Sequence, residues 1–318
     1  MAPSSYTFRL ATPNPCFDLS PHHTRMTACY RDKAGMYHLF TDFIDAAQNT
    51  IQSWASDIRQ YDSPDLLHWQ YQGIAVEKST LGQPDDYGAS SPGILYHNDK
   101  IYLFYAGRQT PVGEMNSLAG PGEPGYLISR ICLAVAPADE LGRITGPFEK
   151  KGIVIDTDAY WRSMRVDDPC AIFQNGQFLL YYKGFYKTGS ERIFSVGFAR
   201  SNENDLHFVS DKTPAFSVDS GCEMPRVFLK DGQKELFLRH FKPIPNKIGL
   251  WGHYREDKNG DFIPVNLNLF NGAGDRSPGA KTAADISSVY LENGEITGEI
   301  LACGSQDGIL KQWLYDID

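Results

Sequence analysis

The sequence of 318 residues is poor in cysteine and in clustered positive charge, and it has no long apolar run. Its six cysteines include no Cys-x-x-Cys pair, and this sparse spacing excludes a disulfide-rich scaffold. We expect reduced thiols. Cys29, Cys132 and Cys170 lie in apolar, strand-like runs, where core packing is the first interpretation and a redox or metal role the alternative.

No run of 18 apolar residues occurs, and the N-terminal stretch MAPSSYTFRLATPNP lacks a charged region followed by an apolar one. We therefore expect a soluble, cytoplasmic protein without a membrane segment. The 30 Lys and Arg residues against 39 Asp and Glu residues give a net charge of −9, and no Lys/Arg-rich block offsets it. This balance argues against nucleic acid and anionic membrane as partners.

Amphipathic helical periodicity is also scarce, whereas short runs of β-branched and aromatic residues bounded by Asn, Asp and Gly recur along the chain. Five segments share a pattern of strand, tight turn and second strand, with the first weaker and the last incomplete. They are residues 26–43, 91–107, 168–184, 224–241 and 284–304. The sequence therefore predicts an all-β fold.

The spacing of these segments indicates a repeat. They start near Met26, Pro92, Pro169, Pro225 and Ala284, at intervals of 66, 77, 56 and 59 residues. Four-strand units at such intervals are typical of a β-propeller, whose blades surround a central channel. Since no Pro/Gly/Ser-rich linker divides the chain, we expect residues 1–318 to form a single five-bladed β-propeller. A pair of β-sandwiches is the alternative.

Four short motifs lie within this framework. Residues 63–69 read SPDLLHW and residues 37–40 read YHLF, while Asp168-Pro and Glu223-x-Pro lead the third and fourth units. Together they resemble the five-bladed propeller glycoside hydrolases of families 43, 32, 62, 68 and 117 over nearly the whole chain. The resemblance is to the superfamily, because such short motifs do not distinguish one family from another.

The resemblance implies a glycosidase with two carboxyl groups, a protonated acid at the leaving oxygen and a carboxylate on the opposite face. Glu223 in GCEMPRVFL is similar to the Glu-x-Pro motif that supplies the general acid. Asp168 in RVDDPCAIF is similar to the aspartate that orients the acid and binds substrate hydroxyls. Asp167 is the alternative to Asp168, and a rim glutamate paired with Arg226 is the alternative for Glu223.

The third carboxylate of these families, an aspartate at the start of the first unit, is missing, because aligning the hairpins puts Thr24 or Arg25 there. Asp18 in NPCFDLSPHH is the nearest acid and our candidate for the base. Asp86 in DDYGASSPG is the second candidate and otherwise a substrate-binding residue. Without an assigned base, inverting and retaining mechanisms both stay open.

Basic and aromatic residues near the unit starts are candidates for binding the substrate. Arg25, Arg165 and Arg226 together would suit an anionic sugar, because guanidinium groups bind carboxylates in bidentate fashion. If each pairs with a neighbouring acid instead, a neutral sugar is expected, and this is the default. Trp54 and Trp161 are candidates for stacking on a sugar, with core packing as the equal alternative.

The scattered histidines form no metal-ligand motif, so no metal or other cofactor is predicted. A calcium ion in the channel is implied only by the resemblance to some family 43 members. The resemblance to family 117 allows a histidine as the acid, which makes His240 a substrate-site residue and a rival to Glu223.

These observations predict a glycosidase that cleaves a terminal glycosidic bond of a short oligosaccharide, since a polymer would not reach a cytoplasmic enzyme. The alternatives are a non-catalytic carbohydrate-binding propeller, a scaffold that holds a protein, and a transferase or phosphorylase of the same clan. The missing first-unit aspartate favours the binding module. Neither the sugar nor the oligomeric state follows from the sequence.

Overall fold

The computed structural model describes residues 6–11, 13–46, 55–116, 119–189, 191–216, 221–240, 251–270, 285–306 and 309–317. These residues form β-strands and two short 3-10 helices, η2 (Tyr160–Arg162) and η3 (Glu292–Gly294). The predicted all-β class is therefore confirmed. In this part of the chain, no helix is long and apolar enough to cross a membrane.

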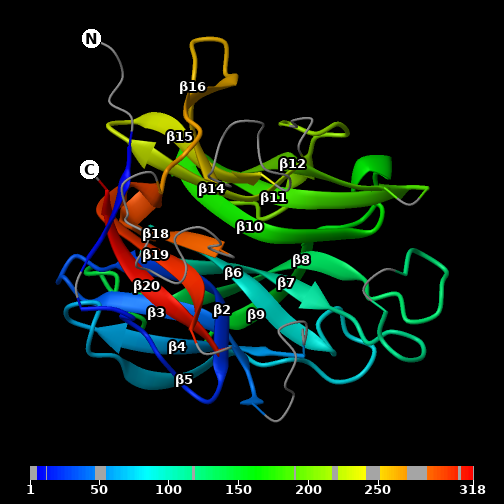
Figure 1. The fold of residues 1–318 in the computed structure, drawn as a ribbon, viewed down its shortest axis with the longest axis horizontal. Helices are drawn as coiled ribbons and strands as arrows, with labels where there is room; N and C mark the ends of the chain where they lie inside the picture. Colours follow the sequence, from blue (N-terminus) through cyan, green and yellow to red (C-terminus); the bar gives the residue numbers. More distant parts are fainter. Residues whose placement is uncertain are drawn as a thin grey trace.

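The described strands fall into five consecutive groups of antiparallel neighbours (Figure 1). The first two groups are β2 (His23–Arg31), β3 (Tyr37–Ile44), β4 (Asp57–Ser63) and β5 (Gln70–Val76), then β6 (Gly88–His97), β7 (Lys100–Arg108), β8 (Ser129–Pro137) and β9 (Glu149–Ile155). The next two are β10 (Arg165–Gln174), β11 (Gln177–Thr188), β12 (Glu191–Asn202) and β13 (Val209–Ser210), then β14 (Cys222–Lys230), β15 (Gln233–His240), β16 (Trp251–Glu256) and β17 (Phe262–Asn266). The last is β18 (Asp285–Tyr290), β19 (Ile296–Gln306), β20 (Ile309–Ile317) and β1 (Phe8–Leu10).

The last group joins the two ends of the chain. Strand β1 pairs antiparallel with β20, with Phe8 opposite Ile317 and Leu10 opposite Tyr315. In Figure 1 the blue first strand accordingly lies beside the red last ones, while the green and yellow strands of the third and fourth groups fill the upper half. The N-terminal strand thus completes the C-terminal group.

The five predicted hairpins are present, and each forms the first two strands of a group. The predicted unit starts at Met26, Pro92, Pro169 and Pro225 lie three or four residues inside the first strands, because the antiparallel ladders begin earlier. Ala284 lies outside the described residues.

A β-bulge recurs near the start of four first strands. Two residues stand opposite a single residue of the neighbouring strand at Arg25-Met26 in β2, Ser91-Pro92 in β6, Asp168-Pro169 in β10 and Met224-Pro225 in β14. Ser91, Asp168 and Met224 have φ values of 50°, 54° and 53°. Because a bulge re-aims the side chains beside it, these positions determine where the polar groups at the strand starts point.

The first strands meet closely above a shared apolar core. A Cβ atom on Gly93 of β6 would overlap the carbonyl oxygen of Pro169 in β10, so the close approach of these strands requires glycine. Cys170 and Val227 follow the bulges of β10 and β14 and belong to the largest core cluster. All six cysteines are buried and none forms a disulfide bond, and the three that the sequence assigned to the core belong to core clusters. The starts of the first strands therefore pack against a tightly packed apolar core.

Candidate active site

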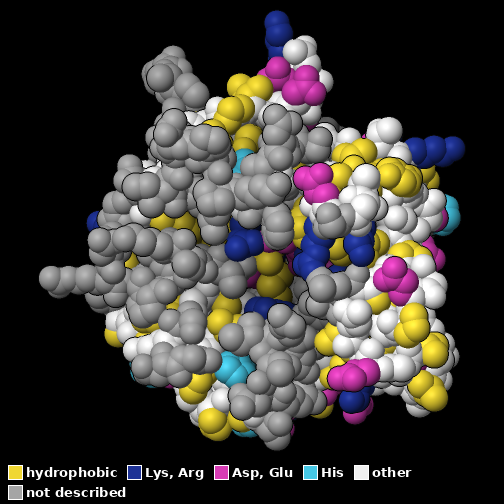
Figure 2. Space-filling model, turned by 45° about the vertical axis from the view of Figure 1, so that its right-hand side comes forward, with side chains coloured by type: hydrophobic (Ala, Val, Ile, Leu, Met, Phe, Trp, Pro, Cys, Tyr) yellow, Lys and Arg dark blue, Asp and Glu magenta, His cyan; other side chains and the backbone are white. Residues whose placement is uncertain are grey.

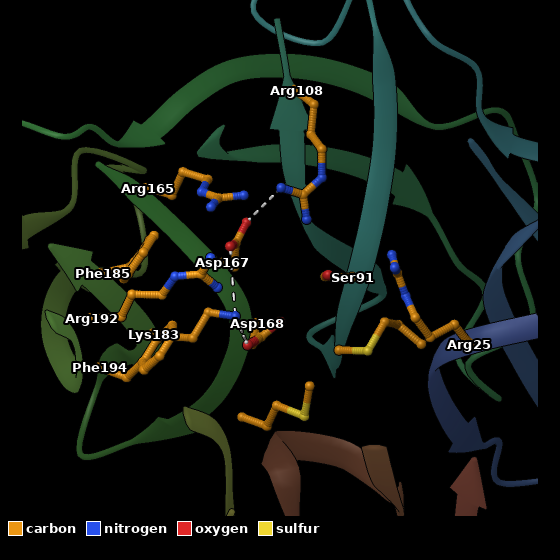
Figure 3. A pocket seen from close by; sticks show the side chains of 12 residues that line it. Arg25, Ser91, Arg108, Arg165, Asp167, Asp168, Lys183, Phe185, Arg192 and Phe194 are labelled. Carbon is orange, nitrogen blue, oxygen red and sulfur yellow. Dashed lines mark ion pairs between the residues drawn. The ribbon is translucent and has the colours of Figure 1, made fainter. Parts of the chain in front are cut away.

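A cavity of about 220 Å³ lies at the starts of the first strands (Figure 3). Its walls come from strands of the first four groups. The residues that line it are Arg25, Met26, Ser91, Arg108, Arg165, Asp167, Asp168, Lys183, Phe185, Arg192, Phe194 and Met224. Five of these side chains are cationic and two are carboxylates, so the cavity is both polar and strongly charged.

Lys183 of β11 joins the two acids that the sequence singles out. Its Nζ atom lies 2.8 Å from Oδ2 of Asp168 and 3.7 Å from Oε2 of Glu223. Burial lowers the pKa of Lys183, but attraction to Asp168, Asp167 and Glu223 outweighs burial and holds this pKa above its usual value. The structure thus brings Asp168 and Glu223 together around one ammonium group.

Glu223 of β14 is buried beside two cations. Its carboxylate pairs with Arg239 as well as with Lys183. Glu223 stands opposite Arg239 across the β14–β15 ladder, just as Asp167 stands opposite Lys183 across the β10–β11 ladder. By register, then, Glu223 corresponds to Asp167, the residue before the bulge. Glu223 therefore holds two ion-pair contacts, and it is not part of the described lining of the cavity.

Asp167, the alternative to Asp168, is buried and also lines the cavity. Its Oδ1 atom accepts a hydrogen bond of 2.6 Å from the Ser129 hydroxyl and lies 3.0 Å from Nη1 of Arg108. Burial raises the pKa of Asp167, but Arg108, Lys183 and Arg165 outweigh burial and hold this pKa well below its usual value. Asp167 is therefore ionised and anchors the surrounding cations.

Arg165 is one of the predicted binding residues and lines the cavity. Its guanidinium carbon lies 5.1 Å from the centre of the Phe185 ring, a cation–π contact. Burial lowers the pKa of Arg165 to about 10 against the attraction of Asp167, and Arg108 adds to the lowering. Arg165 stays cationic at neutral pH, in a place where positive charges crowd together.

Arg25, a second predicted binding residue, also lines the cavity and pairs with a buried acid that sequence reasoning missed. Its Nη2 atom lies 3.0 Å from Oδ2 of Asp42 in β3. Oδ1 of Asp42 accepts the backbone N–H groups of Arg25 and Met26, at 3.2 and 2.7 Å. The one available signal was the lone acid in the strand YHLFTDFI.

Asp18 and Asp86, the candidates for the third carboxylate, are absent from the described lining of the cavity. Oδ2 of Asp18 lies 2.8 Å from Nζ of Lys311. Burial opposes the charge of Asp18, but hydrogen bonds from Lys311 and Ser20 prevail and lower its pKa. Asp86 accepts backbone N–H groups from Gly82 and Thr110, at 2.6 and 2.5 Å, and so ties two loops together.

Arg226, the third predicted arginine, is buried and does not belong to the described lining. Its Nη2 atom lies 2.5 Å from Oδ1 of Asp285, the first residue of β18. Burial raises the pKa of Asp285 to about 6, Arg226 opposes this rise, and Asp168 adds to it. Arg226 therefore forms a buried ion pair between the fourth and fifth groups, which the incomplete fifth repeat of the sequence did not reveal.

The aromatic candidates and His240 are not among the described lining residues. Trp161 is buried against Gly184, and its indole N–H donates a hydrogen bond of 3.0 Å to the carbonyl oxygen of Lys212. Trp54 lies outside the described residues. Burial lowers the pKa of His240 to about 4, and its Nε2 atom lies 2.8 Å from the Tyr254 hydroxyl. His240 is therefore neutral at pH 7 and poorly suited to be an acid.

The cavity does not fit a calcium ion. Its five cationic side chains repel a divalent cation, and its two carboxylates already pair with Arg or Lys. Among the described residues, no group of three His, Cys, Asp or Glu side chains is arranged to hold a metal ion.

Sequence reasoning missed three cations of the lining: Arg108, Lys183 and Arg192. None of them lies at a unit start, since they belong to the second and third strands of their groups. Lys183 gives the clearest signal, because it is the single charge in the apolar run FLLYYKGFY. A lone charge in a buried strand requires a partner, although its spacing does not reveal which one.

The comparisons with known proteins point to one class. The model of the glycosyl hydrolases family 32 N-terminal domain matches residues 29–181, slightly less than half of the chain. No curated protein sequence matches the chain. A family 117 glycoside hydrolase from the marine bacterium Zobellia galactanivorans has a similar structure, with a TM-score of 0.68 and 16% identity over 99% of this chain and 90% of that one.

Two further solved structures have the same fold at 16% identity. A xylan β-1,4-xylosidase from Bacillus halodurans has a TM-score of 0.63 and matches over 95% of this chain and 53% of that one. A sucrose-6-phosphate hydrolase from Lactobacillus gasseri has a TM-score of 0.61, with 92% and 58% covered. The family model and the shared fold together support a glycosidase of the glycoside hydrolase propeller superfamily.

Proposed function

We propose that this protein hydrolyses a terminal glycosidic bond of a short oligosaccharide in the cavity, on a single five-bladed β-propeller formed by residues 1–318. The five strand groups support five blades, with β1 and β20 closing the last one. The largest core cluster supports one domain, because it includes residues of all five groups, from Phe8 to Tyr315.

The convergence of Asp168 and Glu223 carries this proposal. The two acids lie 55 positions apart in the sequence and on different groups, yet both lie within 3.7 Å of the same ammonium nitrogen, Nζ of Lys183. In the resembled families an aspartate beside the general acid orients it, and the closeness of Asp168 and Glu223 supports such a pair. Asp168 lines the cavity, whereas Glu223 is not part of its described lining.

Glu223 is the proposed acid and Asp168 the residue that orients it and accepts substrate hydroxyls. The carboxylate of Glu223 lies beside Arg239 and Lys183, and Lys183 connects it to Asp168.

Asp18 is the proposed base. Its partner Lys311 precedes Gln312, and the Gln312 amide donates a hydrogen bond of 3.1 Å to the carbonyl oxygen of Thr24. This chain of contacts supports a position near the β2 side of the cavity, from which a water molecule is needed to reach the sugar. Asp42 is a weaker candidate, because it is fully buried and both of its oxygens hold Arg25 or Met26.

The test is release of reducing sugar from neutral and acidic aryl glycosides and short oligosaccharides. We expect Glu223→Gln to lower turnover at least about a hundredfold, as loss of a general acid does. Asp168→Asn and Asp18→Asn test the orienting residue and the base. Glu149→Gln on β9 is the matched control, because its exposed carboxylate lies outside the cavity. Turnover that survives Glu223→Gln unchanged overturns the assignment.

A non-catalytic carbohydrate-binding propeller is the second candidate. The observation in its favour is Arg25, a cation at the β2 bulge where the resembled families have an aspartate. This candidate predicts sugar binding without turnover of any substrate in the panel. Adding inorganic phosphate or an acceptor sugar to the same panel separates hydrolysis from phosphorolysis and transfer.

A further inference from the structure

One bulge residue from each of the first four strand groups lines the cavity. These residues are Arg25 in β2, Ser91 in β6, Asp168 in β10 and Met224 in β14. The repeated backbone feature therefore brings four side chains to one space. Three of them are charged or carry a hydroxyl group, whereas the fourth is the thioether of Met224.

Met224 is an unusual residue for its backbone conformation. Its φ of 53° lies in the left-handed region, close to the 54° of Asp168. Asp is enriched in this region, whereas a bulky side chain there is a conformational outlier. The bulge accounts for the positive φ but not for the choice of methionine. Because strained residues cluster where a side chain contacts a ligand, Met224 is a candidate for such a contact.

The side chain of Met224 is held in place without being covered. It packs against the largest core cluster and is only partly buried. Its remaining surface lines the cavity, directly after Glu223 in the chain. A molecule bound in the cavity can therefore contact the thioether.

Other apolar side chains of the described lining accompany Met224. They are Met26, Phe185 and Phe194, and the two phenyl rings stack with centroids 4.7 Å apart and planes 11° apart. Figure 2 shows hydrophobic side chains inside the hollow in the middle of one face, with Lys and Arg side chains around it. The cavity thus offers apolar surface as well as charge.

The polar part of the lining suits sugar hydroxyl groups. Asp168 accepts hydrogen bonds and Lys183 donates them, and these two groups pair at 2.8 Å. The cavity volume of about 220 Å³ is below the roughly 300–1,000 Å³ of sites for drug-sized ligands, so it fits one sugar unit. A sugar that has hydroxyl groups on one side and an apolar substituent on the other matches both parts of this lining.

We propose that Met224 is a specificity-determining residue that contacts the methyl group of a terminal 6-deoxy sugar. The inference rests on the proposed function, since it names the substrate class of the same cavity. A hydroxymethyl group in this place would bury its hydroxyl against the thioether and lose hydrogen bonds to water. A methyl group loses none, and the flexible, polarisable thioether adapts to its shape.

Calorimetric titration of the full-length protein tests the ligand class. The probes are D-fucose, L-fucose, 6-deoxy-D-glucose and L-rhamnose, each beside its hydroxylated parent, D-galactose, L-galactose, D-glucose or L-mannose. We expect at least one 6-deoxy sugar to bind about tenfold or more tightly than its parent, as discrimination in an apolar pocket allows. If every parent binds as tightly as its 6-deoxy partner, or if no 6-deoxy sugar binds, the proposal is overturned.

Met224→Gln tests the residue assignment, because glutamine has nearly the length and flexibility of methionine but a polar end. We expect the variant to lose about tenfold or more of the affinity for the best 6-deoxy sugar and to keep that for its parent. Met36→Gln is the matched control, since Met36 is exposed and does not belong to the described lining. An unchanged preference for the 6-deoxy sugar overturns the role of Met224.

Met224→Ser repeats the test with the residue that β6 carries at the same bulge position, Ser91. Its small side chain leaves the methyl group without its contact, so the same loss of preference is expected. A thermal melt verifies that the variants fold, and the serine variant decides the assignment if the glutamine variant does not fold. A retained preference in the folded serine variant also overturns the role of Met224.

The two proposals fail in different ways. Efficient turnover of hydroxylated glycosides, without any preference for 6-deoxy glycosides, overturns the deoxy substrate and leaves the glycosidase intact. Binding of 6-deoxy sugars that depends on Met224, without turnover of any glycoside, overturns hydrolysis and leaves the ligand class intact.

Discussion

The four bulged first strands share a backbone feature but differ in chemistry. In β10 and β14 the residue before the bulge is an acid, Asp167 or Glu223, and a cation stands opposite on the next strand. In β2 and β6 that residue is Thr24 or Ser90, and the residue opposite is apolar. The repeated backbone therefore supplies equivalent positions, and only one half of the site uses them for paired charges.

The bulge of β2 differs from the other three in its backbone as well. In β6, β10 and β14 a residue with positive φ precedes a proline, which has no N–H group to satisfy. In β2 Met26 replaces the proline, and its backbone N–H requires an acceptor. Asp42 provides it at 2.7 Å and also accepts the N–H group of Arg25. The buried acid of β3 is thus explained by the missing proline of β2.

The largest effect on stability is expected from removing Lys183, the cation shared by the acids of β10 and β14. Lys183→Met leaves three neighbouring carboxylates without their shared cation, and breaking buried ion pairs lowers the free energy of unfolding by about 3–5 kcal/mol. Urea denaturation measures this loss. Lys187→Met on the same strand is the control, since its exposed side chain predicts a change within about 0.5 kcal/mol. Equal stability of the two variants would show that the acids do not depend on Lys183.

The two halves also differ in how much the sequence revealed. The placement of Asp168 and Glu223 at strand starts was predictable, because the unit starts follow from local turn residues and from alternation within each hairpin. Their roles as acid and orienting residue came from the resemblance alone and stay a prediction. Lys183 and Asp42 were not assigned, since their partners are set by register across the bulges rather than by spacing. Arg226 was placed with the cavity arginines for the same reason, whereas its buried partner Asp285 belongs to another group.

A smaller effect on stability is expected from removing Arg25, the cation at the bulge of β2. Arg25→Met leaves the fully buried Asp42 with only backbone donors, and we expect a loss of about 2–3 kcal/mol in the free energy of unfolding. Asp42→Asn and the double variant complete a double-mutant cycle. Because the ion pair is the coupled term, the double variant should lose less than the sum of the single losses. Additive losses would mean that Asp42 serves the backbone of the bulge alone.

The smallest effect on stability is expected from a substitution that gives the bulge of β6 the acid found in β10. Ser91→Asp puts a carboxylate at the bulge position that Asp168 occupies, and Asp tolerates the positive φ of 50° there. We expect stability within about 1 kcal/mol of the parent. The added negative charge repels anionic groups, so turnover of acidic aryl glycosides relative to neutral ones should fall about tenfold.

Ser91→Asn is the matched variant for this experiment, since it has nearly the same shape and backbone tolerance without the charge. Turnover of acidic and neutral aryl glycosides by both variants isolates the electrostatic effect. If the two variants hydrolyse the acidic glycosides equally well, charge at this position does not select the substrate. The contrast between β6 and β10 would then concern packing.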